Sequence, residues 1–362
     1  MTKGAHMEKS TELFDSIIAK VERQRIPLNA HIDLSYRCNL RCIHCYCQGL
    51  SPDFSRGEPE MSEGELLRLV DELADIGSLF LTLSGGEPLL HDSFFTVARH
   101  ARKRRFSLSI LTNGMLVDEE MARKIAGLSP KTVELSIYGA NAAVHDSITR
   151  VDGSFDKLSR AVRLLKARGL RVLLKSVIMK TNMRQSHLIG KAAIEMGADE
   201  HVSTLEVGPK NDRSIDVQRL QLSEEDFREI LSSDPNPLPG ASEALGQKAR
   251  DRLICGCGIL GTYISPYGDV YPCIQLLIPM GNIKRQRFSD IWRSRSSLRD
   301  ELDSICTYAD MPVCRDCEFA GICKKCIGTA YMATGDMRAC HETQRSVLKM
   351  GYEVYCKQGG MR

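Results

Sequence analysis

Hydrophobic and polar positions along residues 28–206 alternate between short β-rich runs and longer amphipathic runs. This alternation is typical of repeated βα units around a parallel sheet. Strands are predicted near residues 30–35, 78–83, 106–111, 131–136, 171–178 and 200–205, and helices near 62–76, 92–104, 118–127, 154–168 and 184–196. The first of these helices begins at Ser62 and has Glu65 three residues later, which predicts a capping box. The pattern predicts six βα units, the sixth of them incomplete.

Six strands are fewer than the eight that close a full (βα)8 barrel. The fold class is therefore α/β, and the sheet is either open or a partial (βα)6 TIM-like barrel over residues 28–206 with a lateral mouth. Residues 1–27 are interpreted as an N-terminal helix with a tag remnant, and residues 207–250 as a polar connecting segment with one helix near 223–232. From residue 251 the chain has short runs rich in Gly and Cys, which predicts a small C-terminal domain over 251–362 held by metal rather than by a large core.

Charge and hydropathy exclude several classes of partner. Forty-nine basic against 46 acidic side chains leave a net charge of +3, which gives no field for attracting nucleic acid or an anionic membrane. No apolar run reaches about 18 residues and the N-terminus has no signal-peptide pattern, so we expect a soluble cytoplasmic protein. In the reducing cytosol, 14 cysteines point to metal or redox chemistry rather than to disulfides.

Three cysteines follow the first predicted strand directly, Cys38, Cys42 and Cys45. A cubane cluster has four irons, so three thiolates leave one iron free to bind a small molecule. Cys47 is interpreted as a bystander. Zinc is the alternative, because thiolates also bind it and His44 is available as a fourth ligand, but side chains of adjacent residues rarely converge on one tetrahedral ion.

This loop resembles the CxxxCxxC loop of the radical SAM superfamily, in which a [4Fe-4S] cluster binds S-adenosylmethionine (SAM) beside a partial (βα)6 barrel. The second strand ends in a segment similar to the family's GGEP motif, whose backbone contacts the methionyl amino group of SAM: Ser84, Gly85, Gly86, Glu87 and Pro88. Two glycines let the backbone approach a ligand closely, and Glu87 is placed to order the loop.

The resemblance implies further SAM contacts on the next three strands. Asn113 ends the third strand at the cluster-bearing edge, and Ser136 ends the fourth. In related enzymes the polar residue at the position of Ser136 faces the ribose of SAM. Lys175 on the fifth strand would pair with the SAM carboxylate, or alternatively lie on a solvated strand face. His44 stands where the family prefers an aromatic side chain near the adenine.

Eight further cysteines form a second group: Cys255, Cys257, Cys273, Cys314, Cys317, Cys323, Cys326 and Cys340. Eight thiolates suffice for two cubanes with four ligands each. A zinc ribbon, the alternative, would separate its paired knuckles by roughly 15–20 residues, whereas Cys317 and Cys323 are much closer. Isolated cysteines such as Cys306 and Cys356 fit the role of small buried hydrophobes.

The second group resembles the SPASM domain, an auxiliary-cluster module of some radical SAM enzymes. The segment from Gly268 to Cys273 is similar to its GxxxxC element. The clusters of that family interleave, which implies two ligand sets: Cys255, Cys257, Cys273 and Cys326, and Cys314, Cys317, Cys323 and Cys340. Only Gly256 separates Cys255 from Cys257, so one of them is a possible non-ligand, which would leave an open iron for substrate.

The resemblance implies a radical SAM oxidoreductase or maturase with three [4Fe-4S] clusters, one binding SAM and two auxiliary. Reductive cleavage of SAM would give a 5′-deoxyadenosyl radical that takes a hydrogen atom from the substrate, with the auxiliary clusters as electron acceptors or substrate ligands. The expected substrate is a ribosomally made peptide that receives a crosslink or a related change. Tetrapyrrole side-chain modification in a haem pathway is the first alternative. A protein that only transfers electrons is the second, and the GGEP element argues against it.

Two details narrow the partners. Sulfatase-maturing relatives carry an aspartate base directly after the GxxxxC cysteine, and Ile274 stands there, which disfavours that branch. About 30 residues precede the first strand, too few for a fused leader-binding domain, so a leader-recognition protein would be a separate partner. We also expect an electron donor such as flavodoxin or ferredoxin, and neither nucleic acid nor a membrane as partner.

Overall fold

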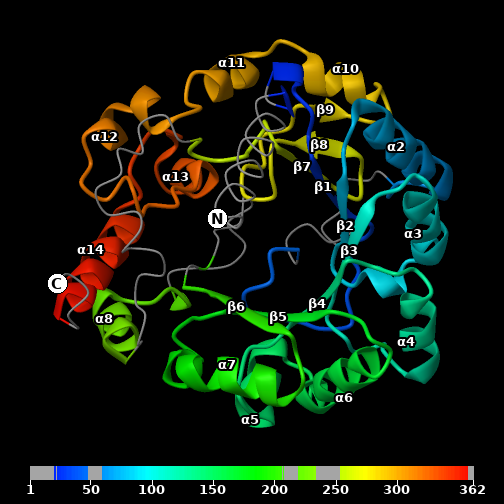
Figure 1. The fold of residues 1–362 in the computed structure, drawn as a ribbon, viewed down its shortest axis with the longest axis horizontal. Coiled ribbons are helices and arrows are strands. Elements are labelled where there is room, and N and C mark those ends of the chain that lie inside the picture. The colour runs from blue at the N-terminus through cyan, green and yellow to red at the C-terminus, as the bar shows by residue number, and fades with distance from the viewer. Residues whose placement is uncertain are drawn as a thin grey trace, which may run out of the picture.

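The computed structural model describes residues 20–47 except 22, residues 59–205, 207, 219–233 and 253–357. Six parallel strands follow one another around the sheet in sequence order. They are β1 (Asn29–Asp33), β2 (Phe80–Ser84), β3 (Ser107–Thr112), β4 (Thr132–Ser136), β5 (Val172–Val177) and β6 (Glu200–Thr204). The strands curve around an interior and the helices lie outside them, as Figure 1 shows. The predicted partial (βα)6 barrel is therefore confirmed.

Five helices that connect these strands agree with the sequence-based prediction: α2 (Glu63–Ile76), α3 (Phe94–Lys103), α4 (Glu119–Ala126), α6 (Ser154–Lys166) and α7 (Ser186–Glu195). The capping box of α2 is present, because the Ser62 side chain accepts from the backbone of Glu65 and the Glu65 carboxylate accepts from the backbone of Ser62. A further helix, α5 (Ala142–Thr149), was not predicted. It is short and follows β4 directly, so its eight residues offered little periodicity.

Beyond the predicted boundary near residue 250, which lies outside the described residues, the sheet continues. Strand β7 (Gly261–Ile264) pairs with β1 in parallel, and β8 (Asp269–Tyr271) and β9 (Gly281–Asn282) extend it in antiparallel fashion. Residues 251–362 were expected to be held by metal rather than by a large core, and the structure shows that part of this region shares the core of the barrel. Ile264, Val270 and Trp292 belong to the same buried cluster as the barrel helices.

Five helices complete the described C-terminal part, with the 3-10 turn η7 (Tyr308–Asp310): α10 (Phe288–Arg293), α11 (Ser297–Asp303), α12 (Pro312–Arg315), α13 (Ile327–Thr334) and α14 (Glu342–Lys357). Two further 3-10 turns, η3 (Pro88–Leu90) and η4 (Met183–Gln185), lie within the barrel. Helix α14 packs against α8 (Glu224–Ser233), the helix predicted near 223–232 (Figure 1). None of the helices in the described ranges is long and apolar enough to cross a membrane.

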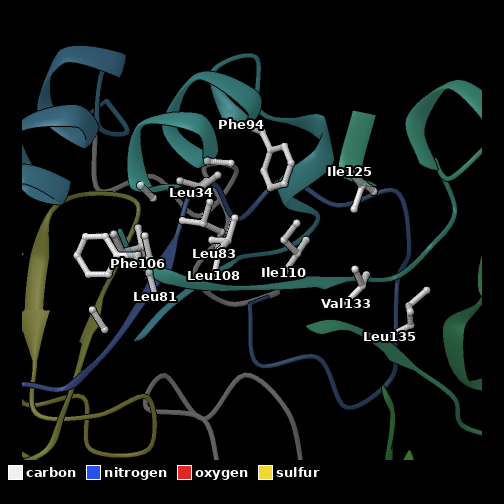
Figure 2. Close-up of a cluster of buried hydrophobic side chains, with 14 of the residues drawn as sticks. Leu34, Leu81, Leu83, Phe94, Phe106, Leu108, Ile110, Ile125, Val133 and Leu135 are labelled. Carbon is white, nitrogen blue, oxygen red and sulfur yellow. The ribbon is translucent and has the colours of Figure 1, made fainter. Parts of the chain in front are cut away.

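The core between strands and helices follows from the alternation of side chains along each strand. Leu81, Leu83, Leu108 and Ile110 are fully buried and meet Phe94 and Ile125 from the helices, as Figure 2 shows. The intervening residues of each strand face the barrel interior, which we call the lumen. On β2 and β3 the lumen-facing side chains Thr82 and Ser109 are therefore each held between two buried hydrophobic neighbours.

Replacing Leu108 by Ala should lower the free energy of unfolding by about 2–5 kcal/mol, because it leaves a cavity at a position with 0% exposure. Urea unfolding followed by circular dichroism measures the change. Leu188→Ala on α7, where the side chain is 42% exposed, is the matched control and should lose much less. Equal losses in the two variants would contradict this account of the core.

Candidate functional site

A cavity of about 240 Å³ opens at the carboxyl ends of β2 to β5 and beneath the loop that follows β1. Most of the residues proposed from the sequence line it: Cys38, Cys42, His44, Cys45, Ser84, Gly85, Gly86, Asn113, Ser136 and Lys175. Glu87 and Pro88 are buried next to it and do not line it. The structure thus brings the candidate SAM-site residues to one place, and their contacts with SAM stay a prediction.

The cysteine loop is anchored to α5 and to β3. The backbone N–H groups of Arg41 and Ile43 donate to Thr149 and Ile148 carbonyls at 3.0 Å each. The side-chain amide of Asn113 donates to the Cys38 thiol at 3.6 Å and to Asn39 at 2.7 Å. The loop is therefore positioned from two directions.

The raised pKa values of two of these thiols indicate which kind of ligand the site can bind. Burial, together with the neighbouring thiols and the Glu87 carboxylate, raises the pKa of Cys38 to about 11. Burial and the same mutual repulsion raise the pKa of Cys42 further. Thiolates gathered in this way need a cationic group between them, and binding iron deprotonates them. The donor set therefore fits an iron–sulfur cluster.

His44 and Cys47 do not act as obvious fourth ligands. The His44 ring packs edge-on against Tyr138, with ring centroids 4.5 Å apart, so it is engaged as an aromatic surface of the cavity wall. Cys47 is 2% exposed and packs in a small cluster with Tyr36 and Tyr267, where burial raises its pKa well above the ordinary value. Its role as a bystander stays a prediction.

The two glycines of the GGEP segment are required by the protein's own backbone. Gly85 has φ +138°, and a Cβ there would lie 2.3 Å from the Ser35 carbonyl oxygen. A Cβ at Gly86 would lie 2.5 Å from the Arg37 carbonyl oxygen. Close approach of a ligand was the reason expected for this pair, whereas the structure shows close packing of the segment against the residues that precede the cysteine loop.

Glu87 joins the GGEP segment to the end of β3. Its carboxylate is fully buried and accepts from the Thr112 hydroxyl at 2.7 Å, the Asn113 N–H at 2.8 Å and the Leu89 N–H at 3.1 Å. Burial raises the pKa of Glu87 to about 7, although these hydrogen bonds act in the opposite direction. The geometry agrees with the expectation that Glu87 orders the loop.

Lys175 and Ser136 are neighbours in the register of β4 and β5, and both face the cavity. The Lys175 ammonium forms an ion pair with Glu134, a cavity residue that the sequence analysis missed. A signal was present, since Glu134 stands between the buried Val133 and Leu135 and must point to the opposite face. Lys175 is half-exposed, so both of its predicted roles stay open.

The later cysteines separate into two sets in space. The Cys257 thiol is in hydrogen-bond contact with those of Cys255 and Cys273, and Cys326 lies within electrostatic reach of Cys255 and Cys273. A second, smaller cavity is lined by the other four: Cys314, Cys317, Cys323 and Cys340. This grouping agrees with the two ligand sets that the resemblance implied, and their binding of clusters stays a prediction. Both Cys255 and Cys257 belong to the first set in spite of the single residue between them.

The spacing of donors bears on the zinc alternative. Within the described ranges, no three His, Cys, Asp or Glu side chains converge closely enough to hold one metal ion. A single zinc draws its thiolates to about 2.3 Å, whereas a cubane carries each thiolate on a different iron and spreads them further apart. The two kinds of metal site therefore require different spacings of the same thiolates, and the iron and zinc content of the protein distinguishes them.

Two buried cations lie beside the later cysteines, and the sequence analysis missed both. Arg299 is 1% exposed, donates to the carbonyls of Gly258 and Trp292, and stacks on the Trp292 ring at 4.9 Å. Lys325 is 5% exposed and donates to the Ala339 carbonyl. Buried positive charge suits the neighbourhood of negatively charged thiolate ligands.

Glu87→Gln should lower the free energy of unfolding by about 1–3 kcal/mol, because the new amide places a donor against one of the three donors around it. The loss should be larger at pH 5 than at pH 8. Folding raises the pKa of Glu87 from 4.5 to about 7, so proton binding by Glu87 stabilises the folded wild type at low pH. This contribution is lost as the pH rises from 4.5 to about 7. Gln does not titrate, so the variant lacks the contribution at every pH.

Urea unfolding at the two pH values measures both effects. Glu225→Gln, which changes an exposed carboxylate on α8, is the control and should show neither. An equal loss at both pH values would count against the raised pKa.

Comparisons with known proteins agree with this geometry. The radical SAM superfamily matches residues 32–185, and SPASM, an iron–sulfur cluster-binding domain, matches residues 255–318. An AdoMet-dependent heme synthase of Methanosarcina barkeri is 28% identical over 337 residues, which cover 84% of this chain and 92% of the relative. The mycofactocin maturase MftC of Mycobacterium tuberculosis is 30% identical over 288 residues, covering 74% of this chain and 71% of the relative.

A solved structure of anSMEcpe with bound AdoMet and the Cp18Cys peptide has a TM-score of 0.69 to this chain. Its sequence is 20% identical to this chain, and the match covers 92% of this chain and 98% of the other. At this identity the likeness concerns the fold. Together with the sequence relatives and the cysteine loop at the sheet edge, it shows that the chain belongs to the radical SAM superfamily and carries a SPASM domain.

Proposed function

We propose that Cys38, Cys42 and Cys45 hold a [4Fe-4S] cluster that binds SAM in the cavity at the sheet edge. The observation that carries this is the meeting of three thiols with the Gly85-Gly86 segment in one cavity. When bound, the cluster and SAM supply a 5′-deoxyadenosyl radical that takes a hydrogen atom from the substrate. The chain's residues hold the reactants in place and exclude water.

Each remaining wall of the cavity has a role in this proposal. The Gly85-Gly86 backbone accepts from the SAM amino group, and Glu87 holds that segment against Asn113. Ser136 faces the ribose, and Lys175 attracts the carboxylate while Glu134 orients it. His44, backed by Tyr138, offers an aromatic surface to the adenine.

The two later cysteine sets hold auxiliary clusters, which brings the number of [4Fe-4S] clusters to three. Their place in the C-terminal part suits electron acceptors or relays for the substrate radical. Cys255 and Cys257 both contribute to the first set, which favours full protein ligation over an open iron. A flavodoxin or ferredoxin supplies the electron that starts the reaction.

The substrate class that fits best is a ribosomally made peptide. The lumen exposes apolar surface, since Tyr46 and Phe80 are each 36% exposed and Val202 is 45% exposed. Phe80 is followed by the core residue Leu81 on β2, and Val202 stands opposite the cavity residue Lys175 in the register of β5 and β6, so both face the lumen. A half-open barrel with apolar and hydroxyl-bearing walls suits an extended peptide. A separate protein recognises its leader.

Tetrapyrrole modification is the second candidate. It is favoured by the similarity to the heme synthase, because the match covers 92% of that relative's length. A tetrapyrrole carries several carboxylates, which arginines would normally bind. Among the described residues that line the cavity, Lys175 is the only Lys or Arg, and Glu134 already pairs with it. The cavity's charge therefore favours a peptide.

The experiment begins with reconstituted protein, dithionite and SAM, and measures 5′-deoxyadenosine by liquid chromatography. Wild type should form it, and Cys42→Ala should not. Cys317→Ala should still form it without a product, because the electron from the substrate has no way out. Full product from Cys317→Ala would contradict the relay, and Cys356→Ala serves as a matched cysteine control.

Metal analysis separates the cluster sets. Three cubanes predict about 12 irons per chain, and zinc in the second group predicts about four. Peptides encoded beside the gene, and iron tetrapyrroles, are then offered as substrates and products are identified by mass spectrometry. If wild type forms no 5′-deoxyadenosine with all clusters present, the chain only transfers electrons and the proposal fails.

A further inference from the structure

Strand β1 carries two titratable side chains into the lumen. Ala30 and Ile32 are 2% and 0% exposed and belong to the core outside the sheet. His31 and Asp33 alternate with them and so face inward. A buried acid and an imidazole in a barrel lumen, just before the cysteine loop, have no part in SAM binding as proposed above.

Asp33 is the centre of a hydrogen-bond network. Its carboxylate is fully buried and lies 3.0 Å from His31 Nε2, 2.8 Å from the Tyr263 hydroxyl and 3.4 Å from the Tyr46 hydroxyl. The Tyr36 hydroxyl lies 2.8 Å from that of Tyr263. Tyr263 stands opposite His31 in the register of β7 and β1, and their rings meet edge to face.

The positions of the protons follow from this geometry. A carboxylate only accepts hydrogen bonds, so Tyr263 and His31 Nε2 must donate to Asp33. The Tyr263 proton is then committed, and Tyr36 must be the donor to the Tyr263 oxygen. Burial raises the pKa of Tyr263 and of Tyr36, which keeps both phenols protonated as donors.

His31 is consequently held as the tautomer with its proton on Nε2. This leaves a lone pair on Nδ1, to which no described residue donates a hydrogen bond, and the side chain is 22% exposed. An imidazole fixed at one nitrogen by a buried carboxylate and open at the other is the arrangement of a general base.

The network is connected to the candidate SAM site. Tyr46 lines the cavity beside the cysteines, is 36% exposed, and donates to Asp33. Tyr46 therefore links the cavity to the wall that β1 and β7 form inside the lumen. In contrast, Ile274 after the cysteine of the GxxxxC element has no titratable group to offer.

We propose that His31 is the catalytic base of the lumen and that Asp33 positions it. The assignment rests on the proposed function. A substrate whose carbon has lost a hydrogen atom to the radical, and an electron to an auxiliary iron–sulfur cluster, must still lose a proton from the heteroatom that bonds to that carbon. That proton passes from an N–H, O–H or S–H group of the substrate to His31 Nδ1. The electron pair of the broken bond stays on the substrate and forms the new bond, and Asp33 balances the imidazolium.

The charged and titratable groups around the His31–Asp33 pair are few among the described residues: Asp33 on the same strand as His31, Tyr263 from β7, Tyr271 from β8, and Tyr36, Tyr46 and Cys47 from the loop after β1. None of these is a cation. The Asp33 carboxylate is therefore the group that compensates a proton gained by His31.

The first test needs no substrate. Nitrogen NMR of the full-length protein labelled with 15N-histidine, with His31→Gln identifying the signal, reports which ring nitrogen carries the proton. At pH 8 we expect a protonated Nε2 and an unprotonated Nδ1. A proton on Nδ1 would overturn the assignment.

The second test uses the peptide or tetrapyrrole that wild type converts. His31→Gln should form 5′-deoxyadenosine at the wild-type rate while product falls about 100-fold or more, and a carbon-centred radical should accumulate in freeze-quenched EPR samples. Asp33→Asn should behave in the same way, because an amide can stabilise the other tautomer. A purely structural role would instead lower iron content and SAM cleavage together.

His100→Gln is the matched control. His100 Nε2 lies 2.8 Å from Asp71 in a second His–Asp pair, on helices outside the barrel, and its loss should leave product unchanged. Undiminished product from His31→Gln would overturn the assignment alone. A wild type that forms no 5′-deoxyadenosine would overturn the proposed function instead.

Discussion

The pairing of β1 with two parallel neighbours is the constraint on which the rest of the molecule depends. Through β2 it belongs to the barrel, and through β7 it joins the C-terminal part to the same sheet. Its outer face supplies Ala30 and Ile32 to the core, and its inner face supplies His31 and Asp33 to the lumen. The cysteine loop continues from its end. One short strand thus fixes the positions of the candidate SAM site, the proposed lumen base and the SPASM domain.

The barrel was predictable from sequence because its elements are long and regular. Each of the six strands was placed within about two residues, and the helices between them have one clearly apolar face. Strand β7 was not predicted. Its four residues, Gly261–Ile264, show no alternation by themselves, and only the partner strand β1, far away in the sequence, makes them a strand.

Some residues of the candidate site could be predicted from the sequence and others could not. Spacing alone marked Cys38, Cys42 and Cys45, since the ligands of one cluster lie on one loop. The GGEP segment was recognised, but the reason for its glycines lies in the Ser35 and Arg37 carbonyls that no pattern reveals. Glu134, Arg299 and His31 were missed because their importance comes from partners on other strands and helices.

The long-range pairing of β1 also has a consequence for the order of folding. Residues 29–32 find their β7 partners at residues 261–264, so the ribosome must produce most of the chain before this side of the sheet can close. Contacts between such distant segments form slowly, because a long loop must first be ordered. During synthesis, Tyr36 and Cys47 on either side of the cysteine loop therefore stay uncovered until Tyr267, with which they form one buried cluster, has been made.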